Sequence, residues 1–140
     1  MGAMRGSNRF EGGKGSVQGT VALGTSTVTT QTRVVGVVPK KCRVTGIRFY
    51  GQSATTATAL TAQVFARTSA GAAGNDLCAD TDIDLAAAAL QAGVDAVLES
   101  SNPEHLNLDE GQLLVVTVTA SAASAGPGDL LVEVEYEPRV

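Results

Sequence analysis

The sequence contains no tryptophan, and only two tyrosines and three phenylalanines occur among its 140 residues. Ligand pockets, and sugar-binding grooves in particular, are usually lined by aromatic side chains. The shortage therefore argues against a glycoside hydrolase, even though acidic residues are plentiful enough to form a catalytic pair. If the chain bound a carbohydrate, only Tyr50, Phe65 or Tyr136 could supply the stacking platform.

Histidine and cysteine are nearly as scarce. The one histidine, His105, follows Glu104, and no Gly-x-Ser-x-Gly motif is present, so we expect a surface histidine and no enzyme. Cys42 and Cys78 permit at most one disulfide, and Cys42 lies in phase with apolar Val44, which favours a buried thiol over a bridge. Zinc-ligand spacing, a phosphate-binding glycine loop and a dinucleotide fingerprint are missing, so we predict no cofactor and no metal site.

Long hydrophobic runs are absent as well. Residues 49–66 and 111–128 are uncharged, but Thr, Ser, Gln and Gly dilute both runs. Neither reaches the roughly 20 mostly apolar residues that a membrane-spanning helix needs. The first ten residues also lack the apolar stretch of a secretory signal. We therefore expect a soluble protein with no membrane partner.

The residues that are present favour β-structure. In residues 37–51 apolar and polar side chains alternate, which is the period of a strand with one buried and one exposed face. Cys42 and Val44 share one face, and after Gly46 the phase shifts by one residue, which turns Phe49 inward. A glycine at such a shift predicts a β-bulge.

Strand-like segments recur along the chain without an internal repeat. We predict an all-β fold, an antiparallel β-sandwich of jelly-roll type with about eight strands, and keep an immunoglobulin-like sandwich as the second choice. Residues 1–15, which are Gly-rich and basic, are predicted to form an extended N-terminal arm, and residues 16–140 to form the β-sandwich domain. The strand-like segments are residues 16–23, 25–30, 32–38, 42–51, 58–67, 80–85, 94–99, 105–108, 112–120 and 130–138.

Three carboxylates, Asp80, Asp82 and Asp84, alternate along one of these segments. Their spacing is that of the start of an EF-hand calcium loop, but Leu85 and Gln91 stand where that loop needs Gly and Glu. We therefore expect a solvated acidic stripe on the outer face of a strand.

Charge is distributed unevenly along the chain. Residues 1–67 carry a net charge of +8 and residues 68–140 a net charge of −12, which together give the overall −4. The split favours a surface with separate basic and acidic regions. The alternative is that the two halves interleave in the sandwich, so that the signs mix. One triplet, Arg48-Phe49-Tyr50, has the character of a base-stacking site, but in an acidic chain it does not indicate nucleic-acid binding, and Tyr50 could equally anchor a protein interface.

Three stretches of the chain carry a resemblance to a known family. They read VVPKKCRVTGIRFYGQSATTATALTAQVFARTSAGAAGNDL, LNLDEGQLLVVTVTA and PGDLLVEVEYEP. In this order they resemble small decoration (cement) proteins of tailed-phage capsids, over roughly residues 17–138. The resemblance implies a β-module that oligomerises, often as a trimer, and bridges neighbouring major capsid subunits. It also implies a virion location on the capsid surface, assembly in the host cytoplasm, and no catalytic residues.

If the resemblance holds, basic and aromatic residues of the arm and of residues 40–50 are the candidates for a capsid or subunit interface. The expected partners are the major capsid protein and further copies of the chain, without nucleic acid. The alternative function is a carbohydrate-binding or adhesin β-sandwich on a virion or cell surface. The candidate interface residues are Arg5, Arg9, Phe10, Lys14, Lys40, Lys41, Arg43, Arg48 and Tyr50.

Overall fold

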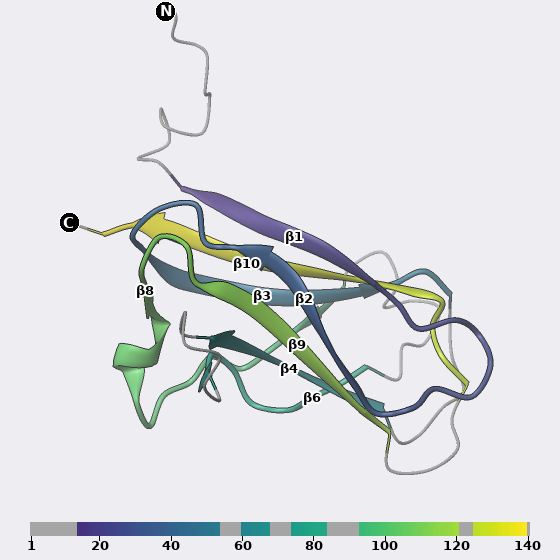
Figure 1. Ribbon diagram of the computed structural model, residues 1–140. Helices are drawn as coiled ribbons and strands as arrows, with labels where there is room; N and C mark the ends of the chain where they lie inside the picture. The colour runs from purple at the N-terminus through teal and green to yellow at the C-terminus, as the bar shows by residue number, and fades with distance from the viewer. Residues whose placement is uncertain (1–13, 54–59, 68–73, 84–92, 121–124, 140) are drawn as a thin grey trace, which may run out of the picture.

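The computed structural model describes residues 14–53, 60–67, 74–83, 93–120 and 125–139, and these residues form two antiparallel sheets packed face to face (Figure 1). The first sheet has the order β1-β10-β3-β7, and β8 also pairs with β3. Its strands are β1 (Gly15–Ala22), β10 (Asp129–Pro138), β3 (Cys42–Gly51), β7 (Val94–Asp95) and β8 (Asn107–Leu108).

The second sheet has the order β2-β9-β4-β5, and β6 also pairs with β4. Its strands are β2 (Gln31–Val37), β9 (Leu113–Ala120), β4 (Leu60–Arg67), β5 (Asn75–Asp76) and β6 (Thr81–Asp82). The predicted antiparallel β-sandwich is confirmed.

Consecutive long strands lie in opposite sheets. The chain crosses from β1 to β2, back to β3, and over again to β4, and β9 and β10 are likewise in different sheets. An immunoglobulin-like sandwich instead keeps several consecutive strands side by side in one sheet, so this topology disfavours the second choice. The jelly-roll assignment stays a prediction, and the strand order is compatible with it.

The described residues form ten strands, against the predicted count of about eight. Four of them, β5 to β8 within residues 75–108, pair for only two residues each. Residues 105–108 were expected to be a strand, but Pro103 opens a 3-10 turn, η2 (Pro103–Leu106), and only Asn107–Leu108 pairs with β3. Residues 25–30 make a single bridge, Thr27 to Ala125, rather than a strand.

The predicted bulge lies in β3 where it pairs with β10. Gly46 is opposite Glu135 and Val44 is opposite Tyr136, so Thr45 is the extra residue. Cys42, Val44, Ile47 and Phe49 are consequently all buried, on both sides of the phase shift. They share the core with the inward residues of β4 and β10, namely Leu60, Ala62, Val64, Ala66, Leu130, Val132, Val134 and Tyr136.

Two glycines allow β1 and β2 to approach each other. A Cβ on Gly19 would overlap the backbone carbonyl of Val35, and a Cβ on Gly36 would overlap the side chain of Val17. Here the two sheets come together at one edge of the sandwich, and a methyl group on either glycine would force them apart.

Both cysteines are buried free thiols, as the sequence favoured. Burial raises the pKa of Cys78 to about 11 and raises the pKa of Cys42 as well. Both side chains therefore pack as neutral groups at physiological pH.

The start of the sandwich is described, but most of the predicted arm is not. β1 begins at Gly15, where Gly15 pairs with Tyr136, one residue earlier than the predicted boundary. The predicted arm residues 1–13 lie outside the described residues. Within the described residues, no helix has the length and apolar character needed to cross a membrane.

Candidate functional site

The outer face of the second sheet is apolar at its centre. Cross-strand pairing places Val34, Val115 and Phe65 in one row across β2, β9 and β4, and places Val37 and Leu113 in the next row, which ends at Arg67 on β4. All five side chains point away from the core. Inward positions alternate with them along β9 and β4, and a bulge between Val34 and Gly36 keeps Val34 and Val37 on the same face of β2. We call these five residues the apolar face.

Exposure distinguishes this face from the rest of the described surface. Val34 is 55% exposed, Val37 is 52% exposed and Leu113 is 37% exposed. Val97, at 71%, is the one other large hydrophobic residue that is exposed within the described residues, and it lies outside the two rows. Three of these four exposed residues are therefore neighbours, and gathering of this kind marks an interaction surface more often than single exposed valines do.

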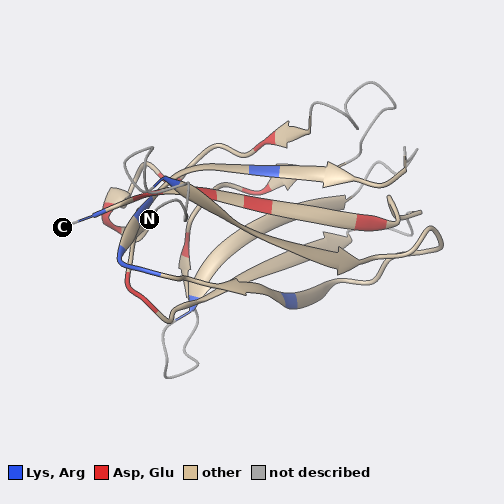
Figure 2. Cartoon of the chain, turned by 90° about the horizontal axis from the view of Figure 1, so that it is seen from above, with Lys and Arg blue, Asp and Glu red and all other residues tan. Residues whose placement is uncertain are grey.

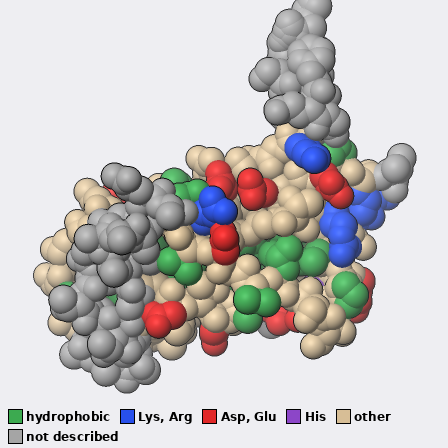
Figure 3. All heavy atoms as spheres, turned by 180° about the vertical axis from the view of Figure 1, so that it is seen from behind, with side chains coloured by type: hydrophobic (Ala, Val, Ile, Leu, Met, Phe, Trp, Pro, Cys, Tyr) green, Lys and Arg blue, Asp and Glu red, His purple; other side chains and the backbone are tan. Residues whose placement is uncertain are grey.

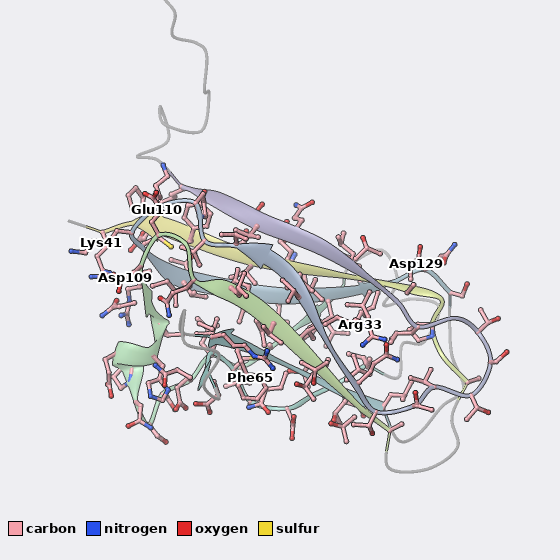
Figure 4. All side chains as sticks on the ribbon, in the orientation of Figure 1. Arg33, Lys41, Phe65, Asp109, Glu110 and Asp129 are labelled. Carbon is pink, nitrogen blue, oxygen red and sulfur yellow. The ribbon has the colours of Figure 1, made fainter. Side chains whose placement is uncertain are left out.

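A shallow hollow lies within the apolar face. It has a volume of about 180 Å³ and is lined by Phe65 and Val115, with Thr32, Arg67, Gly74 and Thr117 around them. Phe65, which is labelled in Figure 4, lies on β4. Although Val115 belongs to the outer face, it is only 2% exposed, so its neighbours cover it. The half-buried Phe65 ring is then the aromatic side chain that a partner could contact.

The outer face of the first sheet has the opposite character. Gln18, Glu133, Arg48 and Asp95 form one cross-strand row over β1, β10, β3 and β7. Gln18 donates to Glu133 over 2.8 Å, and Arg48 donates to Asp95 over 2.6 Å. Figure 2 shows the acidic residues recurring along the strand that leads to the C-terminus. These polar groups partner one another within the sheet, which is typical of a solvated face.

The candidate interface residues on β3 lie on this polar face. Arg43 donates to Asn107 over 2.9 Å, and the hydrogen bond from Arg48 to Asp95 holds the pKa of Arg48 above its usual range. Tyr50 is half-buried and lies within hydrogen-bonding distance of Arg48, at 3.5 Å. Their polar groups are therefore engaged within the molecule and lie on a different sheet from the apolar face.

The other candidate interface residues are spread over the molecule. Lys40 and Lys41 follow β2, and Lys14 immediately precedes β1. Arg5, Arg9 and Phe10 lie outside the described residues. The structure therefore does not bring the candidate set together into one site.

The separate basic and acidic regions that the charge split favoured are not found among the described residues. Strands of the basic half pair with strands of the acidic half, so Arg48 of β3 contacts Asp95 of β7, and Gln18 of β1 contacts Glu133 of β10. Figure 4 shows Lys41 at the same end of the sandwich as Asp109 and Glu110. Figure 3, which shows the molecule from behind, also has basic and acidic side chains next to one another. The alternative, in which the two halves interleave and the signs mix, is the one the structure supports.

The single histidine is less exposed than expected and has different neighbours. His105 is 20% exposed, and its Nδ1 lies 3.1 Å from Oδ1 of Asp76 and 3.8 Å from Oε2 of Glu99. The predicted surface histidine is therefore partly exposed, and η2 places its ring beside Asp76 and Glu99. Asp80 and Asp82 are exposed as predicted, and Asp84 lies outside the described residues.

The apolar face was not predicted, although the sequence contains a signal for it. Val34-Val35 and Leu113-Leu114-Val115-Val116 are consecutive apolar residues within strands. Strict alternation would have left every second position polar, so unbroken runs indicate strands that are apolar on both faces.

Comparisons with known proteins show the fold. No family model matches the chain, and no curated protein matches it. Among solved structures, a chain of the cyanophage Pam1 capsid asymmetric unit matches with a TM-score of 0.55 and 20% sequence identity. The match covers 90% of this chain and 85% of that chain. The sandwich is therefore similar to that of a capsid-structure chain over nearly its whole length.

Proposed function

We propose that this protein is a structural component of a phage virion that decorates the capsid and stabilises it by bridging major capsid subunits. The fold supports this proposal, since its structural neighbour comes from a cyanophage capsid asymmetric unit. The sequence resemblance to decoration proteins points the same way and rests on different observations. The protein acts mechanically and has no catalytic role.

The apolar face is the observation that carries the proposal. The centres of protein interfaces are depleted of charged residues and contain aromatic anchors, and this face has Val34, Val37 and Leu113 around Phe65. The outer face of the first sheet is covered with paired polar groups, whereas the second sheet exposes these apolar side chains. Exposed apolar groups of this kind do not stabilise a monomer in water, so they indicate a partner. The occupant of the apolar face is the outer surface of the major capsid protein.

Bridging requires a second contact. We assign that contact to the arm, residues 1–15, whose Arg5, Arg9 and Lys14 favour an acidic neighbouring surface. In a trimer, each of the three copies would contribute one contact through the apolar face and one through the arm, arranged around one capsid axis. The location that follows is the capsid surface of the virion, after assembly in the host cytoplasm.

The competing function is a carbohydrate-binding or adhesin module. The structure leaves it fewer aromatic side chains for stacking on a sugar than the three that the sequence offered. Tyr136 is only 6% exposed and packs in the core, so it cannot stack on a sugar. Tyr50 and Phe65 remain, but they lie on opposite sheets. No pair of aromatic side chains on one face of the described residues forms a platform.

A binding experiment tests the proposal. The purified protein is run on size-exclusion chromatography with light scattering, alone and after mixing with capsids assembled from the major capsid protein. We expect the mass of a trimer for the protein alone, saturable co-elution with capsids, and a higher melting temperature of the decorated shell. If the protein never co-elutes with capsids, the proposed function is wrong.

A further inference from the structure

The cluster around His105 has the composition and spacing of a metal site. Its three members come from three segments, Asp76 from β5, Glu99 from the segment after β7, and His105 from η2. One ligand atom from each lies within 4.8 Å of the other two. The cluster lies outside the apolar face and has no part in the proposed function.

The distances in the cluster fit a small divalent cation. Zinc binds imidazole nitrogen and carboxylate oxygen at about 2.0–2.2 Å, which in a tetrahedron separates the ligand atoms by about 3.4 Å. The Nδ1 atom of His105 lies 3.1 Å from Asp76 and 3.8 Å from Glu99. The two separations lie on either side of the tetrahedral value, and the Asp76 and Glu99 oxygens lie within 4.8 Å of each other, so small side-chain rotations would bring the three ligand atoms around one cation.

Glu99 is held in place as a ligand would be. Its side chain is only 14% exposed, and its Oε1 accepts the backbone N–H of Ser100 at 3.0 Å, while Oε2 lies toward His105. Asn102 reaches Oε2 over 3.4 Å. Second-shell hydrogen bonds of this kind fix the orientation of metal-ligating carboxylates.

Charge also favours a cation here. Two carboxylates face one imidazole, so even a protonated ring leaves the cluster with a net negative charge. No lysine or arginine within the described residues forms an ion pair with Asp76 or Glu99. A divalent cation would neutralise both carboxylates and leave the imidazole neutral.

The surrounding backbone gives such a site a structural role. Cys78 and Leu98 form an isolated bridge, and Glu99 donates its backbone N–H to the carbonyl of Leu77 over 2.9 Å. These contacts join the β5–β6 edge of the second sheet to the segment that returns to the first sheet. A metal held by Asp76, Glu99 and His105 would tie the two segments together just beyond this bridge.

We propose that Asp76, Glu99 and His105 bind a divalent transition metal of the zinc type, with water completing the coordination. One imidazole with two carboxylates suits Zn²⁺ better than Ca²⁺ or Mg²⁺, which bind through oxygen alone. Three protein ligands on a partly exposed cluster predict moderate affinity, and the site stabilises the fold rather than carrying out chemistry.

The test is titration of the purified full chain with ZnCl₂, followed by calorimetry, melting temperature and the NMR signals of the imidazole. Because His105 is the only histidine in the sequence, those signals report on this site alone. We expect one Zn²⁺ per chain, a raised melting temperature and a shifted imidazole resonance. His105→Gln and Glu99→Gln should each weaken binding at least about tenfold.

Glu104→Gln is the matched control, because this exposed carboxylate is adjacent to His105 and outside the cluster. It should bind Zn²⁺ as the wild type does. Circular dichroism of each variant shows that the sandwich is intact. The proposal is overturned if binding does not saturate, if His105→Gln binds equally well, or if Ca²⁺ and Mg²⁺ bind as tightly as Zn²⁺ does.

Discussion

Val34 and Phe65 lie in one cross-strand row of the second sheet, on either side of Val115. Val34 is 55% exposed, whereas Val115 between them is 2% exposed. The sheet thus covers one outward valine and leaves its neighbour open to solvent. We interpret the open Val34 as part of the proposed docking surface, since covering it within the monomer would have stabilised the fold.

Phe65→Ala tests how much the row of Val34, Val115 and Phe65 contributes to the stability of the fold. The ring is half-buried and flanks Val115, so we expect the free energy of unfolding to fall by about 2 kcal/mol, less than the roughly 3–5 kcal/mol lost with a fully buried ring. Urea unfolding of the variant and the wild type measures this difference. An unchanged free energy of unfolding would show that the ring does not cover Val115.

Gly19→Ala tests the close approach of β1 and β2. The added methyl group would overlap the carbonyl of Val35, and we expect a loss of about 2–3 kcal/mol in the free energy of unfolding. Thr20→Ala is the control, because Thr20 is the exposed neighbour on the same strand and should change stability by less than about 0.5 kcal/mol. Equal stability of the two variants would contradict the packing described for this edge.

Part of the fold and of the candidate site could be predicted from the sequence, and part could not. The bulge at Gly46 and the inward position of Phe49 after it follow from local alternation, and they were predicted correctly. The convergence of Asp76, Glu99 and His105 depends on the path of the chain between them, which no local pattern encodes. Residues 80–85, 94–99 and 105–108 were predicted as strands, but only two residues of each pair, in β6, β7 and β8, because a local pattern does not fix how far a partner strand runs alongside. β5 was not predicted, since pairing for two residues leaves no period to detect.

Because the thiol of Cys78 is buried, we predict that the folded protein loses stability at alkaline pH. Burial raises its pKa from 9.0 to about 11, so the unfolded chain loses the proton at lower pH than the folded protein does. The resulting stabilisation is complete below about pH 9 and disappears as the pH rises through 11, and it is on the order of 2–3 kcal/mol.

Urea unfolding at pH 7.5, 9 and 10.5 measures this effect. The decrease in stability across that range should be smaller in Cys78→Ala than in the wild type, because the variant lacks the titrating thiol. Identical decreases would show that Cys78 is not the responsible group. Reducing agent should leave the melting temperature unchanged at neutral pH, because both cysteines are free thiols.

Deletion of residues 1–13 tests the proposed arm. β1 begins at Gly15, so the truncated chain retains every described strand and should keep the circular dichroism spectrum and melting temperature of the full chain. Occupancy on capsids should fall, because Arg5 and Arg9 are lost with the arm. Full occupancy by the truncated protein would mean that the arm makes no bridging contact.

The most direct measurement of the proposed docking surface is co-sedimentation of Val34→Asp with capsids, compared with Val97→Asp. Both variants place the same charge at an exposed valine, but only Val34 belongs to the apolar face. We expect both proteins to remain folded, with Val34→Asp binding at least about tenfold more weakly, since a charge in an interface centre must be desolvated. Val97→Asp should bind as the wild type does. Equal binding by the two variants would contradict docking through the apolar face.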